Sequence, residues 1–162
     1  MPRDGSRTRS AIADAALALL REGGLPAFSV EGVSSRAQVA KGLVLYHYGS
    51  RARLIELCGT RVGDERSQRL IDAGTGKSGV AAIDAVWEEL LRQHQDGTAR
   101  AWLSLAAAGA IRTAPDDDVV AQARRMLLDG CAGALAAGAP AAGVREAYDA
   151  LALALLRMED ES

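Results

Sequence analysis

A short segment near the N-terminus carries the side chains that are best suited to bind the phosphates and base edges of DNA. Lys41 supplies a cation for a base edge or a phosphate, and Gly42 lets the backbone approach closely. Leu43 can meet a thymine methyl group, although it cannot make a hydrogen bond. Tyr46 and His47 can each donate to a phosphate oxygen, which positions a protein without reading sequence. These residue types at this spacing predict a nucleic-acid interface.

Three residues outside this segment extend the predicted interface. Ser29 precedes a predicted helix whose N-terminus can hold a further phosphate. Arg7 can reach the DNA backbone, and Arg51 adds a cation close to the segment. Lys41, His47 and Arg51 could instead be ordinary solvated surface residues. The residues expected at the DNA interface are Arg7, Ser29, Ala40, Lys41, Gly42, Leu43, Tyr46, His47 and Arg51.

The elements that position these side chains are two short helices joined by a tight turn. Residues 30–37 and 41–48 read as helices, and residues 38–40 form the turn between them. This is the spacing of a helix-turn-helix, whose second helix can enter the DNA major groove. Val44 and Tyr48 lie one helical turn apart and are expected to face the core, which turns the polar side of the second helix outward.

The rest of the chain also reads as helix, because its apolar residues recur with helical rather than strand periodicity. The pattern predicts an all-α protein with eight helices. A three-helix head that contains the helix-turn-helix would span residues 1–52, and a helical body would span residues 53–162. The other predicted helices cover residues 7–23, 50–73, 80–95, 98–112, 118–137 and 144–157, with acidic residues 116–118 marking the start of the seventh.

The distribution of charge also separates the head from the body. The net charge of the chain is −2, but residues 1–53 carry a net charge of +4 and the remainder carries −6. A basic head on an acidic body predicts a polyanionic partner for the head alone.

Several classes of protein are disfavoured by what the sequence lacks. Its longest apolar stretch is too short to span a bilayer and no secretory signal is evident, so we expect a cytoplasmic protein without a membrane partner. Cys58 and Cys131 show no metal-ligand spacing, and no catalytic set is assembled. We therefore expect no metal, no cofactor and no enzymatic activity.

The N-terminal third of the chain resembles the DNA-binding domain of the tetracycline-repressor (TetR) family. The resemblance rests on Arg9-x-x-Ile12-x-x-Ala15-Ala16-Leu17-x-Leu19-Leu20-x-Glu22-x-Gly24, Phe28-Ser29-Val30, Ala37-Gln38-Val39-Ala40-Lys41-Gly42 and Tyr46-His47-Tyr48-Gly49-Ser50-Arg51-x-x-Leu54. It implies a transcriptional regulator, a repressor that binds a palindromic double-stranded operator and responds to a ligand.

The family resemblance further implies a homodimer, because the bodies of such regulators usually associate through their last two long helices. Both of these helices are rich in alanine and glycine, which permits close approach of a partner helix. The candidate interface residues are Leu127, Leu128, Leu135, Leu151, Leu155 and Leu156.

The resemblance also implies an effector that binds in the body. The predicted helices at residues 80–95 and 98–112 are expected to carry few charges on their inner faces, which predicts a small, largely apolar molecule. The candidate pocket residues, each of which could equally be plain core, are Leu57, Cys58, Trp87, Leu91, His94, Trp102 and Leu105.

Two departures from the family pattern leave an alternative open. Gln38 stands in the turn where the family carries glycine, and a non-glycine residue held in a left-handed conformation costs on the order of 1 kcal/mol. Gly32 lies in the first helix of the motif, where a better helix former is usual. Both would suit a helical ligand-binding or protein-interaction module that has lost DNA binding.

Overall fold

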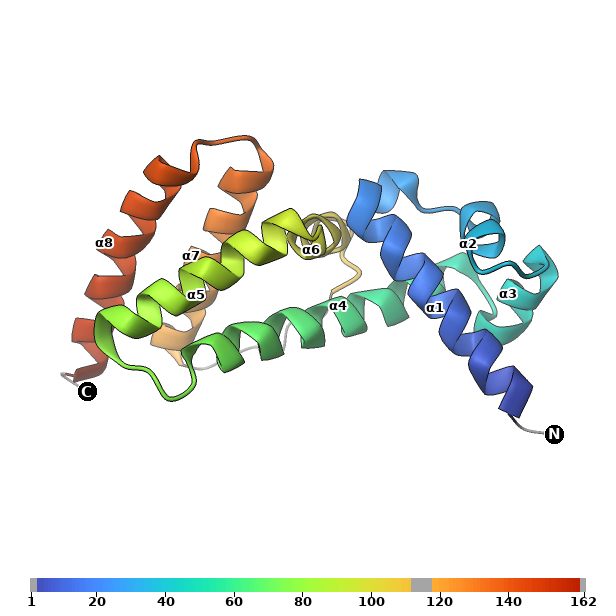
Figure 1. Cartoon of the computed structure of the whole chain (residues 1–162), viewed down its shortest axis with the longest axis horizontal. Helices are drawn as coiled ribbons and strands as arrows, with labels where there is room; N and C mark the ends of the chain where they lie inside the picture. Colours follow the sequence, from blue (N-terminus) through green and yellow to red (C-terminus); the bar gives the residue numbers. More distant parts are fainter. Residues whose placement is uncertain (1–2, 112–117, 161–162) are drawn as a thin grey trace. The chain divides into compact units, whose positions relative to one another are not determined.

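The computed structural model describes residues 3–111 and 118–160, and these residues form helices and loops without any strand (Figure 1). The all-α prediction is confirmed. No helix in the described part of the chain is both long enough and apolar enough to cross a membrane. The helices are α1 (Arg3–Gly23), α2 (Val30–Arg36), α3 (Lys41–Tyr48), α4 (Arg51–Gly74), α5 (Gly79–Gln95), α6 (Thr98–Ala107), α7 (Val119–Ala136) and α8 (Ala141–Asp160), with a 3-10 helix at Leu25–Ala27.

Most predicted helix boundaries hold to within a few residues, but three do not. Helix α1 begins at Arg3, four residues before the predicted start. Helix α6 ends at Ala107 rather than at residue 112, because Gly109 adopts a positive φ of 68° and reverses the chain. Helix α8 begins at Ala141, because the carbonyl of Pro140 accepts from the amide of Val144 and so starts the helix early.

The start of α7 follows the acidic signal in the sequence. The carboxylate of Asp118 accepts hydrogen bonds from the amides of Val120 and Ala121, at 2.9 and 3.3 Å. These bonds satisfy two of the amides that a helix leaves unpaired at its N-terminus. The other acidic residues of the signal, at positions 116 and 117, lie outside the described residues.

The chain divides into two compact units. Residues 1–64 and 100–112 form the first unit, and residues 65–99 and 113–162 form the second. Helix α4 therefore contributes to both units, and α6 belongs with the N-terminal helices. The sequence predicts a boundary between residues 52 and 53 that separates two functions rather than two compact units, and this boundary stays a prediction.

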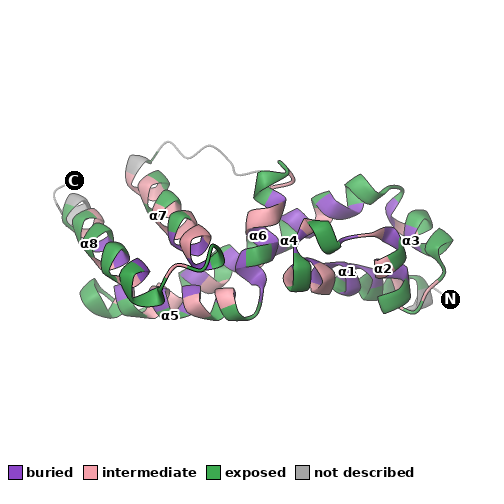
Figure 2. Cartoon of the chain, turned by 90° about the horizontal axis from the view of Figure 1, so that it is seen from above, coloured by how far each residue is buried: buried purple, intermediate pink, exposed green. Residues whose placement is uncertain are grey.

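The core of the first unit gathers apolar side chains from α1, α2, α3, α4 and α6, and buried residues recur along each of these helices (Figure 2). Ile12 and Leu20 of α1, Leu54 of α4 and Leu105 of α6 are fully buried there. Burying a leucine or isoleucine side chain stabilises a fold by about 1.5–3 kcal/mol, so this shared core holds the short helices α2 and α3 in place.

Helix α6 is fastened to the N-terminal helices by close backbone approach and by polar contacts. A Cβ atom at Gly59 of α4 would lie 2.3 Å from the carbonyl oxygen of Ala110, so only glycine fits there. The hydroxyl of Ser104 accepts from the amide of Leu25 at 3.1 Å. Arg100 donates to two carbonyls near the end of α1, at 2.8 and 3.0 Å.

The second unit has its own core, built from α4, α5, α7 and α8. Trp87 of α5 and Tyr148 of α8 are buried with their ring centroids 5.5 Å apart. The Tyr148 hydroxyl donates to the carbonyl of Ile83 at 3.1 Å, and Arg145 lies over the Trp87 ring. This aromatic contact joins α5 to α8.

Each unit buries one free cysteine. Cys58 lies in the core of the first unit and Cys131 in the core of the second. Burial raises the pKa of the Cys58 thiol to about 12, and it also raises the pKa of Cys131. Both side chains therefore remain protonated at neutral pH.

The turn between α2 and α3 holds Gln38 in a left-handed conformation, with φ at 55°. Gln38 is exposed, and it is the one described non-glycine residue with a positive φ. The strain that the sequence suggests is therefore present in the structure.

We expect Gln38→Gly to raise the free energy of unfolding by up to about 1 kcal/mol, because glycine adopts this conformation without a steric penalty. Chemical denaturation followed by circular dichroism measures the change. Gln38→Ala is the control and should give no gain, since alanine meets the same penalty as glutamine. A Gln38→Gly variant less stable than the parent would contradict the strain argument.

Candidate nucleic-acid interface

Helix α3 packs into the core along one side, as its sequence predicts. Val44 and Tyr48 are buried, which confirms the expected inner face. On the other side Lys41, Gly42 and Leu43 are exposed. A Cβ at Gly42 would meet no atom within 4 Å, so this turn of the helix is open to a close approach.

Tyr46 is the most prominent side chain on the outer side of α3. It is 81% exposed, although large aromatic side chains are usually mostly buried. Its ring meets the half-buried His47 ring edge to face, with centroids 5.3 Å apart. The phenol group is thus held at the surface by the helix and by its neighbour, with its hydroxyl available to a phosphate.

Tyr48 joins α3 to α1 through its hydroxyl group. The hydroxyl donates to the carbonyl oxygen of Arg9 at 2.6 Å, and the Arg9 guanidinium lies 5.5 Å from the centre of the Tyr48 ring. Burial raises the pKa of Tyr48, so the hydroxyl keeps its proton and remains a donor. These contacts hold the C-terminal end of α3 against α1.

Ser29 caps the N-terminus of α2, as expected. Its hydroxyl accepts from the amide of Gly32 at 2.9 Å. A Cβ at Gly32 would lie 3.0 Å from the Ser29 oxygen and 3.2 Å from a methyl carbon of Leu19 in α1. The glycine that departs from the family pattern therefore lets α2 pack closely on α1 without crowding its cap.

The remaining predicted interface residues differ in how they are engaged. Arg51 donates to the carbonyl of Phe28 at 3.3 Å and lies over the Phe28 ring, so part of its bonding capacity is used within the chain. Arg7 is exposed on α1 rather than placed on an arm before it. Ala40 is exposed and is the N-cap residue of α3.

One acidic residue at this surface was not among the predicted interface residues. The Glu31 carboxylate, in the first turn of α2, forms a hydrogen-bonded ion pair with the Lys41 ammonium. The hydrogen bond from Lys41 lowers the pKa of the Glu31 carboxyl group. Ten residues separate the two positions in sequence, so only the fold brings them together.

The predicted effector-pocket residues fall into different parts of the structure. Leu57, Cys58, Trp102 and Leu105 belong to the core of the first unit. Trp87 and Leu91 belong to the core of the second unit, and His94 is half-buried on α5. The structure thus places six of the seven residues in two separate cores, with His94 in neither, and an effector pocket stays a prediction.

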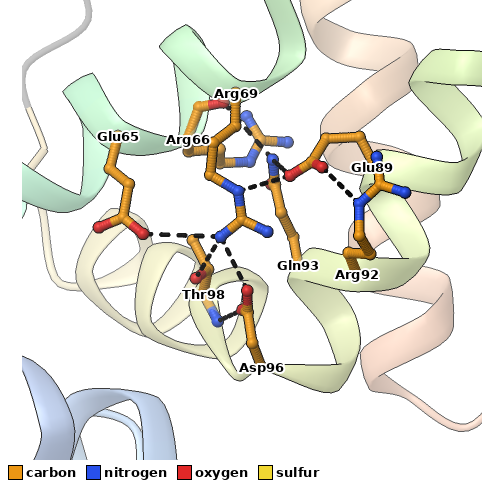
Figure 3. A network of polar contacts seen from close by, with 8 residues as sticks. All are labelled: Glu65, Arg66, Arg69, Glu89, Arg92, Gln93, Asp96 and Thr98. Atoms are coloured by element: carbon orange, nitrogen blue, oxygen red, sulfur yellow. Dashed lines mark hydrogen bonds and ion pairs between the residues drawn. The ribbon is translucent and has the colours of Figure 1, made fainter. Parts of the chain in front are cut away.

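The expectation of few inward-facing charges is wrong for α5. Glu89 and Gln93 lie one helical turn apart and are both buried. Figure 3 shows them within a polar network, in which Glu89 accepts from the side chains of Arg69 at 2.6 Å and Arg92 at 2.8 Å. The Gln93 amide group donates to Glu89 at 3.1 Å, and its oxygen has no hydrogen-bond partner among the described residues.

The same network ties α4 to the segment that precedes α6 and to α7. Arg69 pairs with Asp96 at 2.7 Å and also donates to Thr98. Arg66 is almost completely buried and pairs with Asp129 of α7 at 2.9 Å. Burial lowers the pKa of Arg66, and the Asp129 carboxylate opposes this. The spacing of Arg66 and Arg69 on α4 was a signal that two cations share one face of that helix.

The predicted dimer-interface residues lie along α7 and α8, where the structure has an apolar groove of about 430 Å³. Leu127 and Leu151 line this groove, Leu151 being 55% exposed. Leu128 and Leu156 are half-buried against the core, and Leu155 is half-buried. Leu135 is buried within the second unit. Met126, which the sequence analysis did not select, is an exposed part of the groove.

Comparison with known proteins agrees with this geometry. Residues 12–58 match the family model for the N-terminal domain of bacterial regulatory proteins of the tetR family. These residues include α2, α3 and the turn between them. No match is found among curated protein sequences. Among the described residues, no group of His, Cys, Asp and Glu side chains is placed to hold a metal ion.

Solved structures extend the likeness beyond the N-terminal domain. The multidrug binding protein EbrR complexed with imidazole is 23% identical, with a TM-score of 0.66 over 93% of each chain. A TetR-family transcriptional regulator from Streptomyces coelicolor is 24% identical, with a TM-score of 0.57 over 92% of this chain and 99% of that one. These matches show a shared fold.

The helix-turn-helix within residues 12–58 is of the class found in bacterial regulatory proteins of the tetR family. The likeness to this family covers residues 12–58, and beyond them the solved structures share the fold of the chain.

Proposed function

We propose that the protein is an effector-responsive repressor that binds a palindromic operator as a homodimer, with α3 in the major groove. The observation that carries this proposal is the division of α3 into two sides. Val44 and Tyr48 anchor the helix in the core, while Lys41 and Tyr46 stand exposed on its other side. A helix held in this way can be inserted into a groove without unfolding its supports.

Dimer formation is supported by the groove between α7 and α8. The groove is lined by apolar and small residues, and two of its large side chains, Met126 and Leu151, are exposed in the single chain. Burying such side chains against a second copy would remove apolar surface from water. A two-fold dimer would then present two α3 helices to half-sites about 34–36 Å apart.

The response to an effector would be a shift between two populations of the dimer. In one conformation the two heads cannot reach both half-sites, and a small molecule that binds this conformation more tightly releases the operator. The molecule can shift the equilibrium by no more than the difference between its affinities for the two conformations. The structural relative EbrR, a multidrug binding protein, supports a small ligand.

The chemistry of the proposed effector follows from the interior of the body. The sequence predicts a largely apolar molecule, and the mainly apolar cores of the two units are compatible with such a ligand. The buried Glu89 and Gln93 add polar groups to it, so we propose an apolar molecule that also carries a hydrogen-bond donor. Titrating such compounds into the operator complex, followed by fluorescence anisotropy, tests the proposal.

The alternative of a module that has lost DNA binding gains no support from the two departures that suggested it. Gly32 is explained by its packing against Leu19 and Ser29, and the turn holds Gln38 in the conformation that glycine would adopt. Both residues are compatible with an intact helix-turn-helix.

Direct binding measurements test the proposed role of α3. Operator duplexes are first selected from random oligonucleotides with the parent protein. We expect Lys41→Ala to weaken operator binding by about five- to 150-fold if Lys41 contacts a base. Tyr46→Phe should weaken it less, by about three- to tenfold, because one hydrogen bond to a phosphate is lost.

Lys77→Ala is the matched control for Lys41→Ala. Lys77 is the other lysine of the chain and lies in the loop between α4 and α5, so its removal makes the same exchange away from the head. Its operator affinity should equal that of the parent. If Lys41→Ala also binds as the parent does, α3 is not the recognition helix.

A further inference from the structure

We propose that Glu31 competes with DNA for Lys41 and thereby lowers the affinity of the head for DNA. Glu31 would be a residue that sets DNA affinity and its salt dependence without being required for binding. This inference rests on the proposed function, because it takes Lys41 to be a DNA contact.

The pair is placed where DNA could displace it. Lys41 is the first residue of α3, and Glu31 is in the first turn of α2. Their side chains are 55% and 65% exposed. An ion pair with this exposure is held weakly, so an approaching phosphate or base edge can take over the ammonium group.

The pair also removes most of the positive charge that α3 offers. Lys41 is the only lysine or arginine in Lys41–Tyr48. One nearby cation is engaged elsewhere, since Arg36 binds both carboxylate oxygens of Glu22, at 2.5 and 2.7 Å. Pairing Lys41 with Glu31 therefore neutralises the single Lys or Arg charge of the recognition helix.

The helix termini explain why an anion beside Lys41 is favourable. The N-terminus of a helix carries a partial positive charge, which favours Glu31 in the first turn of α2 and disfavours Lys41 in the first turn of α3. An anion beside Lys41 offsets that repulsion. In the unbound protein the Glu31 carboxylate supplies this anion, and in the complex a DNA phosphate or base acceptor would supply it.

Competition of this kind has two separable effects on binding. The ammonium must leave or share the carboxylate, which lowers affinity, and the carboxylate itself repels phosphates. A lysine masked by a carboxylate also releases fewer counterions, so the salt dependence of binding is shallower. Removing the carboxylate should therefore raise the affinity and steepen the salt dependence together.

Glu31→Gln tests the proposal in the full-length protein. We expect it to bind a random-sequence duplex about three- to tenfold more tightly than the parent at 0.1 M salt. The slope of log affinity against log salt should steepen by about 0.9, the increment for one further phosphate contact. Weaker binding to the selected operator would show instead that Glu31 itself contacts a base, and would overturn the proposal.

Asp14→Asn is the matched control. The Asp14 side chain is 67% exposed and pairs with Arg61 of α4, so its neutralisation changes the charge of the first unit equally without touching Lys41. Its gain in affinity should be below twofold. A gain equal to that of Glu31→Gln would show a general effect of charge and would overturn the competition.

The double variant Lys41→Ala/Glu31→Gln separates this inference from the function on which it rests. In the Lys41→Ala background, the gain from Glu31→Gln should shrink to that of Asp14→Asn. If Lys41→Ala weakens binding but Glu31→Gln has no effect, the competition fails alone. If Lys41→Ala also has no effect, the proposed role of α3 fails as well. Thermal unfolding of each variant confirms that it is folded.

Discussion

Leu151→Glu is expected to convert the protein into a monomer and to weaken operator binding by about 100-fold or more. Leu151 lines the apolar groove between α7 and α8 and is 55% exposed in the single chain. A glutamate there stays solvated in the monomer, so the fold is retained. In a dimer the same carboxylate would be buried without a partner, which is strongly unfavourable.

The size of the expected loss follows from the coupling of two half-sites. When two heads are joined, binding of the first places the second at a high effective concentration beside its half-site, and the gain in affinity can reach about 10²–10⁴. A monomer loses this gain, although each α3 is unchanged. Analytical ultracentrifugation measures the oligomeric state, and fluorescence anisotropy with the selected operator measures the affinity.

Ile71→Glu provides the control for an exposed apolar residue replaced by a charge. Ile71 of α4 is 61% exposed and lies outside the groove. This variant should stay dimeric and bind the operator as the parent does. A dimeric Leu151→Glu variant with parental affinity would exclude the groove as the interface between copies.

Gly59→Ala is expected to lower the free energy of unfolding by about 2–3 kcal/mol. The added Cβ would lie 2.3 Å from the carbonyl oxygen and 3.1 Å from the carbonyl carbon of Ala110. Backbone atoms cannot rotate away as a flexible side chain can, so the chain after α6 must shift. The expected net loss already includes a gain of about 1 kcal/mol, because alanine has a better helix propensity than glycine.

Gly133→Ala makes the same exchange in α7 and serves as its control. A Cβ at Gly133 would meet no atom within 4 Å. We therefore expect no loss of stability and a gain of up to about 1 kcal/mol from helix propensity. Urea denaturation of both variants gives the two changes. A Gly59→Ala variant as stable as the parent would mean that α4 and the residues after α6 are less closely packed than the structure shows.

The parts of the structure that sequence analysis could predict are those that depend on local signals. The starts of α2 after Ser29 and of α7 at the acidic signal could be predicted, because the side chains of Ser29 and Asp118 each satisfy amides within the first turn that follows. Val44 and Tyr48 were readable as an inner face because one helical turn separates them. These signals need no knowledge of which helices are neighbours, so the helix-turn-helix was predicted with its correct inner side.

The parts that sequence analysis missed depend on contacts between helices. Glu31 pairs with Lys41 only because the turn brings the starts of α2 and α3 together. Arg66 finds Asp129 across 63 positions of sequence. The aromatic residues Trp87 and Trp102, expected in one pocket, lie in different cores, because helical periodicity identifies a buried face but not the helix that covers it.

The two buried thiols give the protein a separate chemical reporter in each compact unit. Cys58 is protonated and completely buried, so a thiol reagent reacts with it only when the surrounding helices open, whereas Cys131 is protonated and lines the groove between α7 and α8. The labelling rate of Cys58 thus reports the opening of the unit that carries the helix-turn-helix, and that of Cys131 reports access to the groove of the second unit. With no engineered label, the two rates can show whether an operator or an effector steadies one unit, the other, or both.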